Sequence, residues 1–384
     1  MTSPAPAWDT TSAWHELLAG LGDLDRTFLA GPRAVRGERA AVEGYRALAT
    51  TLGVALDAYL FADPARPAFV DVNTPFRRDR RWGGDNTDAW YAFTPIDPAR
   101  TYRVRGRRGD SAYFSLTVYN EPSPGEWSNR IVAIVNDTDL AVGEDGAFEL
   151  VMGPARPPGY EGTFVALDPD AAVAFTRDYQ VDPRAGRRVT WEIEALDDPP
   201  PLARTDAGTA GALRAALAWS RMLFQIVPLA TAEPDPATTL GHNAPGAANA
   251  FAQPYQVGDA NFGWSARDAC YAFAAYALAP DEALVVTHRP PRCRFWNMVA
   301  WNPFMATEAV TDARTSVNHG SAVPNADGTV TVVVAQDRLA HPNAISTCGH
   351  DRGTLALRWF LADAVPARPE ATVVPAAEAP IAPG

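Results

Sequence analysis

Apolar residues recur at spacings of three and four in two early segments of the chain. This spacing puts them on one face of a helix and predicts helices over Ser12–Phe28 and Glu38–Phe61. The same spacing predicts a further helix over Thr209–Ile226.

From Ala68 onward the pattern changes to short runs rich in Val, Ile, Tyr, Phe and Thr, bounded by Asn, Asp, Gly and Pro. Such runs predict antiparallel strands joined by tight turns. In the first half of the chain the predicted strands are Trp90–Phe93, Tyr102–Gly106, Ala112–Tyr119, Ile131–Val135, Phe148–Val151, Ala172–Tyr179 and Val189–Ile193. A second strand-rich region runs from Tyr271 to Phe360, so the order of elements predicts two modules.

The two strand-rich regions repeat each other. Asp88–Phe93 matches Asp268–Phe273 at five of six positions, 180 positions later. Further blocks pair at offsets of 181 and 182: Thr117–Asn120 with Val299–Asn302, Glu144–Gly146 with Ala326–Gly328, and Phe175–Arg177 with Ala356–Arg358. A nearly constant offset over several blocks indicates duplication of one β-module and its preceding helix. Asp-Gly in both copies also predicts hairpins over Glu144–Val151 and Ala326–Val334.

We therefore expect a mainly β fold with flanking helices: two duplicated antiparallel β-sandwich or jelly-roll-like modules, each preceded by a helix. The expected divisions are N-terminal helices over 1–62, a first β-module over 63–200, a helix and Pro/Gly-rich linker over 201–253, and a second β-module over 254–365. Residues 366–384 are rich in Pro, Ala and Glu, which predicts a disordered tail. Small molecules often bind between two such lobes.

Composition removes several classes of function. The 384 residues carry a formal net charge of −12, which argues against nucleic-acid binding. All basic residues are arginine, which excludes a pyridoxal phosphate Schiff base and a P-loop nucleotide site, because both need a lysine. No run of apolar residues is long enough to span a membrane. Three cysteines without a CxxC pair and no signal-like N-terminus predict a cytoplasmic protein.

The histidines are concentrated after the first β-module, where five of the six lie: His242, His288, His319, His341 and His350. The loop from His341 to Thr354 carries two of them and leads into a strand. His341 and His350, with His319 or Asp351 as a third ligand, would suit zinc or iron. Their spacing matches no standard metal signature, so surface and turn-stabilising histidines are favoured and the cofactor stays open.

The same loop contains the residue types of a nucleophilic site. Ser346 or Cys348 would be the nucleophile, with His341 or His350 as base and Asp351 as the orienting acid. The chain has no Gly-x-Ser-x-Gly elbow, and Ser, His and Asp are ordinary loop residues, so the structural interpretation is again favoured.

In the first module, Trp82–Tyr91 joins glycines, acids, an amide and aromatic residues. A binding interpretation puts Asp85, Asn86 and Asp88 at a pocket mouth. Trp82 and Trp90 would stack there on a ring or sugar. A glycine turn with an Asx cap is the favoured alternative.

In the second module, alternation along Arg294–Trp301 sends Asn297 to one face of a strand and Trp296 to the other. One face is core, and the other, with Trp301, is a candidate lobe interface. Arg177 and Arg358 are equivalent by the duplication and sit in apolar strands, so we expect them to pair with buried carboxylates or carbonyls. Arg358 is also a candidate substrate-binding residue.

Several ordered blocks resemble a known family. Gly83–Asp97, Thr101–Asp110 and Phe114–Asn120 resemble bacterial proteins of the domain-of-unknown-function 1214 family, and the segments Arg294–Asn297 and Gly349–Thr354 are similar to that family's closing part. A weaker similarity joins Asn86–Tyr91 to the companion 1254 family. Where the 1214 family usually has Asp-Thr-Ala-Gly-His, this chain has Ile345–His350. The resemblance implies a jelly-roll-like, two-module fold and no particular reaction.

Two functional hypotheses follow. The first is a catabolic or tailoring enzyme that holds a small, partly apolar molecule between the lobes, with His350 or His341 as general base or metal ligand. The second is a non-catalytic binder of a small molecule or carbohydrate, using Trp82, Trp90, Trp296 and Trp301. A perturbed histidine in a cleft favours the first, and an aromatic cleft without convergent titratable groups favours the second. A structural role, with sheet edges pairing in a homo-oligomer, remains a third.

Overall fold

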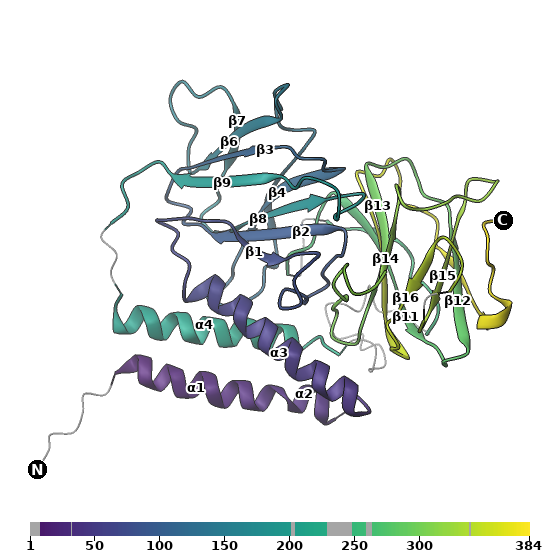
Figure 1. Ribbon diagram of the computed structural model, residues 1–384. Helices are drawn as coiled ribbons and strands as arrows, with labels where there is room; N and C mark the ends of the chain where they lie inside the picture. Colours follow the sequence, from purple (N-terminus) through teal and green to yellow (C-terminus); the bar gives the residue numbers. More distant parts are fainter. Residues whose placement is uncertain (1–7, 32, 201–203, 229–247, 259–262, 338) are drawn as a thin grey trace, which may run out of the picture.

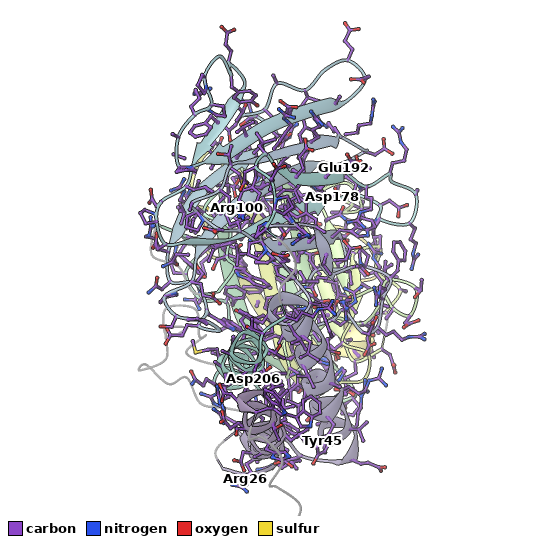
Figure 2. The ribbon with its side chains drawn as sticks, turned by 90° about the vertical axis from the view of Figure 1, so that its left-hand side faces the viewer. Arg26, Tyr45, Arg100, Asp178, Glu192 and Asp206 are labelled. Carbon is purple, nitrogen blue, oxygen red and sulfur yellow. The ribbon has the colours of Figure 1, made fainter. Side chains whose placement is uncertain are left out.

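The computed structural model describes the whole chain except residues 1–7, 32, 201–203, 229–247, 259–262 and 338. Two β-modules lie side by side, with the long helices packed together under the first (Figure 1). The helices are α1 (Asp9–Leu24), α2 (Arg26–Leu29), α3 (Glu38–Tyr59) and α4 (Asp206–Phe224). Figure 2 labels Arg26, Tyr45 and Asp206 on these helices, at the end of the molecule away from Glu192 of the first module.

Each helix follows the spacing seen in the sequence, with local differences. The segment expected as one helix over Ser12–Phe28 divides at Asp25 into α1 and α2. The hydroxyl of Thr205 caps α4 by accepting a hydrogen bond from the Gly208 amide at 3.1 Å, so α4 begins before Thr209. Among the described residues, no helix combines the length and the apolar character needed to cross a bilayer.

The first module consists of two sheets. One has the strand order β1-β2-β8-β4-β5 and the other β7-β6-β3-β9. The strands are β1 (Val70–Asn73), β2 (Ala89–Pro95), β3 (Tyr102–Arg107), β4 (Tyr113–Asn120), β5 (Ile131–Asn136), β6 (Ala147–Gly153), β7 (Thr163–Ala166), β8 (Ala171–Tyr179) and β9 (Thr190–Ala195). An apolar core that includes Phe114, Leu116 and Leu150 fills the space between the two sheets.

The second module repeats this arrangement strand by strand. Its sheets have the orders β10-β11-β17-β13-β14 and β16-β15-β12-β18, which are the orders of the first module with every strand number raised by nine. The strands are β10 (Tyr255–Gln256), β11 (Ala269–Ala277), β12 (Glu282–His288), β13 (Phe295–Trp301), β14 (Ser316–Asn318), β15 (Val330–Ala335), β16 (Ala344–Ser346), β17 (Arg352–Phe360) and β18 (Glu370–Pro375). The expected duplication and the mainly β fold are confirmed.

Two expectations are wrong. The segment 366–384 is not a disordered tail, because β18 pairs antiparallel with β12, as its counterpart β9 pairs with β3. The Pro- and Ala-rich composition of this segment gave no clear strand pattern. Ala371 and Val373 of β18 nevertheless pack against the second core. Asp-Gly does form a turn in each copy, with Gly146 and Gly328 at positive φ. No hairpin follows, because β6 and β15 pair with the more distant β3 and β12.

The two five-stranded sheets face each other across the module boundary. Phe360 of β17 lies 4.4 Å from Tyr113 and 4.5 Å from Tyr179, measured between ring centroids, and Phe295 lies 5.1 Å from Tyr179. Residues of α3 and α4 join this cluster, which includes Val54. The modules and helices therefore share a core, and it surrounds the candidate site.

Candidate functional site: a cavity between the modules

A cavity of about 170 Å³ lies between the two five-stranded sheets. Both modules and α4 contribute to its wall. Five of the eleven tryptophans of the chain line it: Trp82, Trp127, Trp219, Trp264 and Trp301. The polar groups in the wall include four tyrosines and two arginines: Tyr91, Tyr179, Tyr255, Tyr271, Arg177 and Arg358. The wall is therefore largely aromatic.

The duplication explains how both arginines reach one cavity. Tyr91 of β2 lies opposite Arg177 of β8, and Tyr271 of β11 lies opposite Arg358 of β17. Side chains of directly opposed residues in an antiparallel pair project to the same face of the sheet. Because the two sheets face each other, the two Tyr-Arg pairs approach the same space from opposite sides.

Both terminal nitrogens of Arg177 have hydrogen-bond acceptors in the protein. One terminal nitrogen donates to Thr117 Oγ1 at 2.9 Å, and the other donates to the Tyr119 hydroxyl at 2.6 Å. The second nitrogen also donates to the carbonyl oxygens of Trp264, at 2.6 Å, and Ser265, at 3.2 Å. The expectation of buried carbonyl partners is confirmed for this arginine. Arg177 thus ties β4 to a loop of the second module.

Arg358 is buried in the equivalent position but has weaker partners. One terminal nitrogen donates to the Gly84 carbonyl at 2.9 Å, and the other lies 3.3 Å from the Tyr91 hydroxyl and 3.5 Å from that of Tyr179. Its Nε has no hydrogen-bond partner. Burial alone would lower the pKa of Arg358, but the neighbouring tyrosines outweigh it and raise that pKa, so the group is a cation.

Three residue pairs occupy matching positions around the two arginines, and two of them account for the difference. Gly84 corresponds to Trp264, and both supply a backbone carbonyl to the arginine of the other module. Thr117 corresponds to Val299, which offers no acceptor. Tyr119 corresponds to Trp301, whose ring lies 5.2 Å from the Arg358 guanidinium and gives a cation–π contact in place of a hydrogen bond.

The tyrosine hydroxyls supply further donors. The oxygens of Tyr91 and Tyr179 are 2.5 Å apart, so one donates to the other. Tyr271 accepts from the Ala266 amide at 3.2 Å. Burial raises the pKa of Tyr91 and of Tyr271, which keeps both hydroxyls protonated. Within the described part of the chain, neither the Tyr271 proton nor the second proton of the Tyr91–Tyr179 pair has an acceptor.

Two duplicated aspartates lie next to the cavity and join the modules. Asp88 accepts from Asn297 Nδ2 at 2.7 Å and from Ser316 Oγ at 2.9 Å. Asp268 accepts from the Tyr113 hydroxyl and from Asn136 Nδ2. Burial raises the pKa of both carboxyl groups. No carboxylate oxygen of the described residues lies within 4.0 Å of a guanidinium nitrogen of Arg177 or Arg358.

Asp85, Asn86 and Asn297, expected to bind substrate, instead hold the module boundary together. Asp85 is fully buried, pairs with Arg81 at 2.6 Å and accepts from the amide and hydroxyl of Thr307 at 2.8 and 2.7 Å. Asn86 Oδ1 accepts from the Asp88 amide at 2.9 Å, which is the expected Asx turn, and from Asn297 Nδ2 at 2.8 Å. None of the three lines the cavity.

The aromatic candidates divide between the cavity and the module cores. Trp301 lines the cavity, and its indole nitrogen donates to the Asp85 carbonyl at 2.8 Å. Trp90 projects to the other face of β2, where it contacts Phe76 and Arg188. Trp296 lies in the second core beside His288. The alternation along β13 is confirmed, with Phe295, Asn297 and Val299 on the interface side.

His350 contacts the helical layer and does not reach the cavity. Its Nε2 lies 2.7 Å from Glu43 Oε2 of α3, and its Nδ1 lies 2.6 Å from the Thr347 carbonyl. Burial opposes the effect, but hydrogen bonds from His350 and Arg39 lower the pKa of Glu43. Asp351, the expected orienting acid, is exposed and pairs with its neighbour Arg352 at 3.7 Å. The acid beside His350 is therefore Glu43.

The other histidines occupy separate places. His341 is buried in a turn, where its Nδ1 accepts from the Asn343 amide at 3.0 Å, and burial lowers its pKa. His319 is exposed at the ring edge of Phe295. His288 lies in the second core, where burial lowers its pKa to about 3. His242 lies outside the described residues. Among the described residues no three His, Cys, Asp or Glu side chains converge as a metal site, so His319, His341 and His350 do not form one.

Sequence reasoning missed most of the cavity wall. Of the candidates, Trp301 and Arg358 line the cavity, and Trp82 was placed at a pocket mouth. Tyr91 and Tyr271 went unrecognised, although they match at the offset of the repeat and each lies opposite a buried arginine. The duplication was the signal that would have identified them. Trp219 comes from α4 and Trp127 from a loop, and nothing in the pattern joins them to the site.

Comparison with known proteins gives a partial family match. A family described as "Protein of unknown function (DUF1214)" matches residues 91–182, which run from β2 to just beyond β8 of the first module. The match supports the resemblance stated from the sequence over this part of the chain and does not extend to the second module. The weaker resemblance to the 1254 family is not confirmed.

A crystal structure of an uncharacterised protein from Burkholderia cenocepacia is similar over nearly the whole chain. It has a TM-score of 0.83 and 27% sequence identity, and covers 95% of this chain and 97% of that one. The VPA0106 protein from Vibrio parahaemolyticus is more distant, with a TM-score of 0.49, 14% identity and coverage of 92% and 100%. The comparison with curated proteins gives no match.

Proposed function

We propose that this protein is a non-catalytic binder of a small molecule, held in the cavity between the two β-modules. The observation that carries the proposal is the cavity of about 170 Å³, whose wall contains five tryptophans. Concave, largely apolar spaces with a few convergent polar groups are typical ligand sites, and they favour boundaries between modules.

The positions of the histidines support binding over catalysis. Neither His341 nor His350 lines the cavity, and the titratable groups that do are arginine and tyrosine. Arginine stays protonated, and burial raises the pKa of Tyr91. Such groups hold a ligand but exchange protons poorly near neutral pH. The cytoplasm remains the proposed compartment, consistent with three free cysteines.

Ligand binding can be followed by tryptophan fluorescence, because five tryptophans line the cavity. Single-ring compounds would be titrated into the full chain while tryptophan fluorescence and heat are recorded. We expect saturable binding at one site. Absence of binding across a panel of charged and neutral rings would refute the proposal.

A pair of matched variants places the site. Phe273 lines the cavity and is partly buried, so Phe273→Trp reduces the space and is expected to weaken binding at least about tenfold by calorimetry. Phe69 is also partly buried, but it packs against the first core next to Trp191. Phe69→Trp is the control and should bind as the unmodified protein does. Equal affinities in the two variants would put the ligand elsewhere.

A further inference from the structure

Hydrogen-bond donors outnumber acceptors where Arg358 meets the cavity. The Arg358 Nε, the Tyr271 proton and one proton of the Tyr91–Tyr179 pair have no acceptor among the described residues. Buried donors are ordinarily satisfied, and leaving one unpaired costs free energy. A ligand that fits here must therefore bring acceptors.

The positive charge of Arg358 also favours a ligand that brings acceptors. Arg358 is a buried cation without a carboxylate partner within 4.0 Å among the described residues, and the nearby Asp88 is already bonded to Asn297 and Ser316. Burying an uncompensated charge is costly, and an anion in the cavity would offset that cost.

We infer that the ligand is a small carboxylate with an apolar body of about one ring, whose carboxylate binds Arg358 and the tyrosine hydroxyls. This inference rests on the proposed function and names the ligand class of the same site. A cavity of about 150 Å³ in another protein holds benzene, so a space of about 170 Å³ suits one ring with a small substituent.

The wall suits both ends of such a molecule. The planar fork of arginine matches a carboxylate with two parallel hydrogen bonds, and the Trp301 ring restrains the guanidinium from one side. The part of the wall beside Arg177 offers Trp264 and Phe175, whose rings lie 4.9 Å apart and can contact an apolar body. Arg358 is favoured over Arg177 as the anion site, because both terminal nitrogens of Arg177 already have close acceptors in Thr117, Tyr119 and the 264–265 carbonyls.

The first test compares benzoate with benzamide on the unmodified full chain. The two are nearly the same size, but only benzoate is charged. We expect benzoate to bind at least about tenfold more tightly, the fold-change typical of a hydrogen bond to a charged group. Equal affinities would overturn the carboxylate inference and leave the binding proposal intact. Binding of neither compound, with no other ring bound, would overturn both.

The second test assigns the preference to Arg358. Arg358→Met should reduce the ratio of benzoate to benzamide affinity to about one. Arg188→Met is the matched control, because Arg188 pairs with Asp71 and stacks on Trp90 away from the cavity. A preference that survives in Arg358→Met would overturn the assignment without affecting the binding proposal. Chemical unfolding of each variant confirms that it is folded, and the ligand comparison on the unmodified protein stands whether or not Arg358→Met folds.

Discussion

Arg177 and Arg358 occupy the same position in the two modules, but their surroundings differ. Each lies opposite a tyrosine and donates to a backbone carbonyl of the other module, Trp264 or Gly84. Arg177 has two further acceptors on the neighbouring strand, and Arg358 has none there. Duplication thus produced two buried cations that both cross the module boundary, and only Arg177 has further acceptors on its neighbouring strand.

The second copy differs from the first by small changes on β13. Valine replaces threonine at position 299 and tryptophan replaces tyrosine at position 301, relative to the first module. Gly84 has a positive φ, and a Cβ there would lie 3.2 Å from the Trp301 ring, so the loop passes close to the larger side chain. The two modules have the same strand order. They differ in the hydrogen-bond acceptors that surround the buried arginine.

The largest expected effect comes from removing each arginine in turn and comparing the stability of the two variants. Arg177→Met leaves Thr117, Tyr119 and two carbonyls without their donor, and we expect it to lower the free energy of unfolding by about 3–4 kcal/mol. Arg358→Met removes a buried charge with few partners, so we expect the free energy of unfolding to stay within about 1 kcal/mol of that of the unmodified protein. Urea unfolding of the two variants measures the contrast. Equal losses would show that both arginines are structural.

The sequence predicted the architecture well because it depends on repeated patterns. The spacing in α3 and the alternation in β13 each report which side of an element is buried, and the offset between Asp88 and Asp268 reports the duplication. The site depends on contacts that no local pattern encodes. Glu43 lies 307 residues from His350, the histidine it contacts, and Asp85 lies 222 from Thr307. Residue types alone suggested chemistry for His350 and Asp85. Tertiary contacts show a hydrogen bond between His350 and Glu43, and an anchor between Asp85 and Thr307.

The modules also differ in their contact with α3, because His350 of the second module contacts Glu43 of this helix. Nothing in the first module matches His350, because that module contains no histidine. Glu43→Gln keeps the size of the side chain and removes the charge that faces His350 and Arg39. We expect a loss of about 2 kcal/mol in the free energy of unfolding at neutral pH.

The pH dependence of this loss follows from the pKa of Glu43. The folded protein lowers that pKa from 4.5, so the stabilisation is fully present above pH 4.5 and is lost as pH falls through the folded value. The difference between Glu43→Gln and the unmodified protein should therefore narrow as the pH falls from about 6 to about 3. Unfolding curves across this range test it, with Glu38→Gln on the same helix as the control. A difference that widens below pH 4.5 would contradict the assigned partners.

The smallest expected effects come from two substitutions that exchange one hydrogen-bond acceptor between the modules. Thr117→Val removes a hydrogen-bond partner of Arg177, and we expect it to cost about 1 kcal/mol of unfolding free energy without altering benzoate binding. Its reciprocal, Val299→Thr, adds a hydroxyl on the matching strand position next to Arg358. The two substitutions have nearly the same size and opposite consequences for the two arginines.

Val299→Thr tests whether spare donors, and no other property of Arg358, make the anion site. A threonine hydroxyl in the place that Thr117 takes beside Arg177 would accept from Arg358 and compete with a carboxylate for the same nitrogen. The preference for benzoate over benzamide should then fall by about threefold to tenfold, because one charge-assisted hydrogen bond is shared, while benzamide affinity stays the same. Calorimetry with both compounds measures the ratio. If the ratio is unchanged although the protein folds normally, the acceptors on β4 do not explain why Arg177 and Arg358 differ, and the ring at position 301 becomes the residue to exchange next.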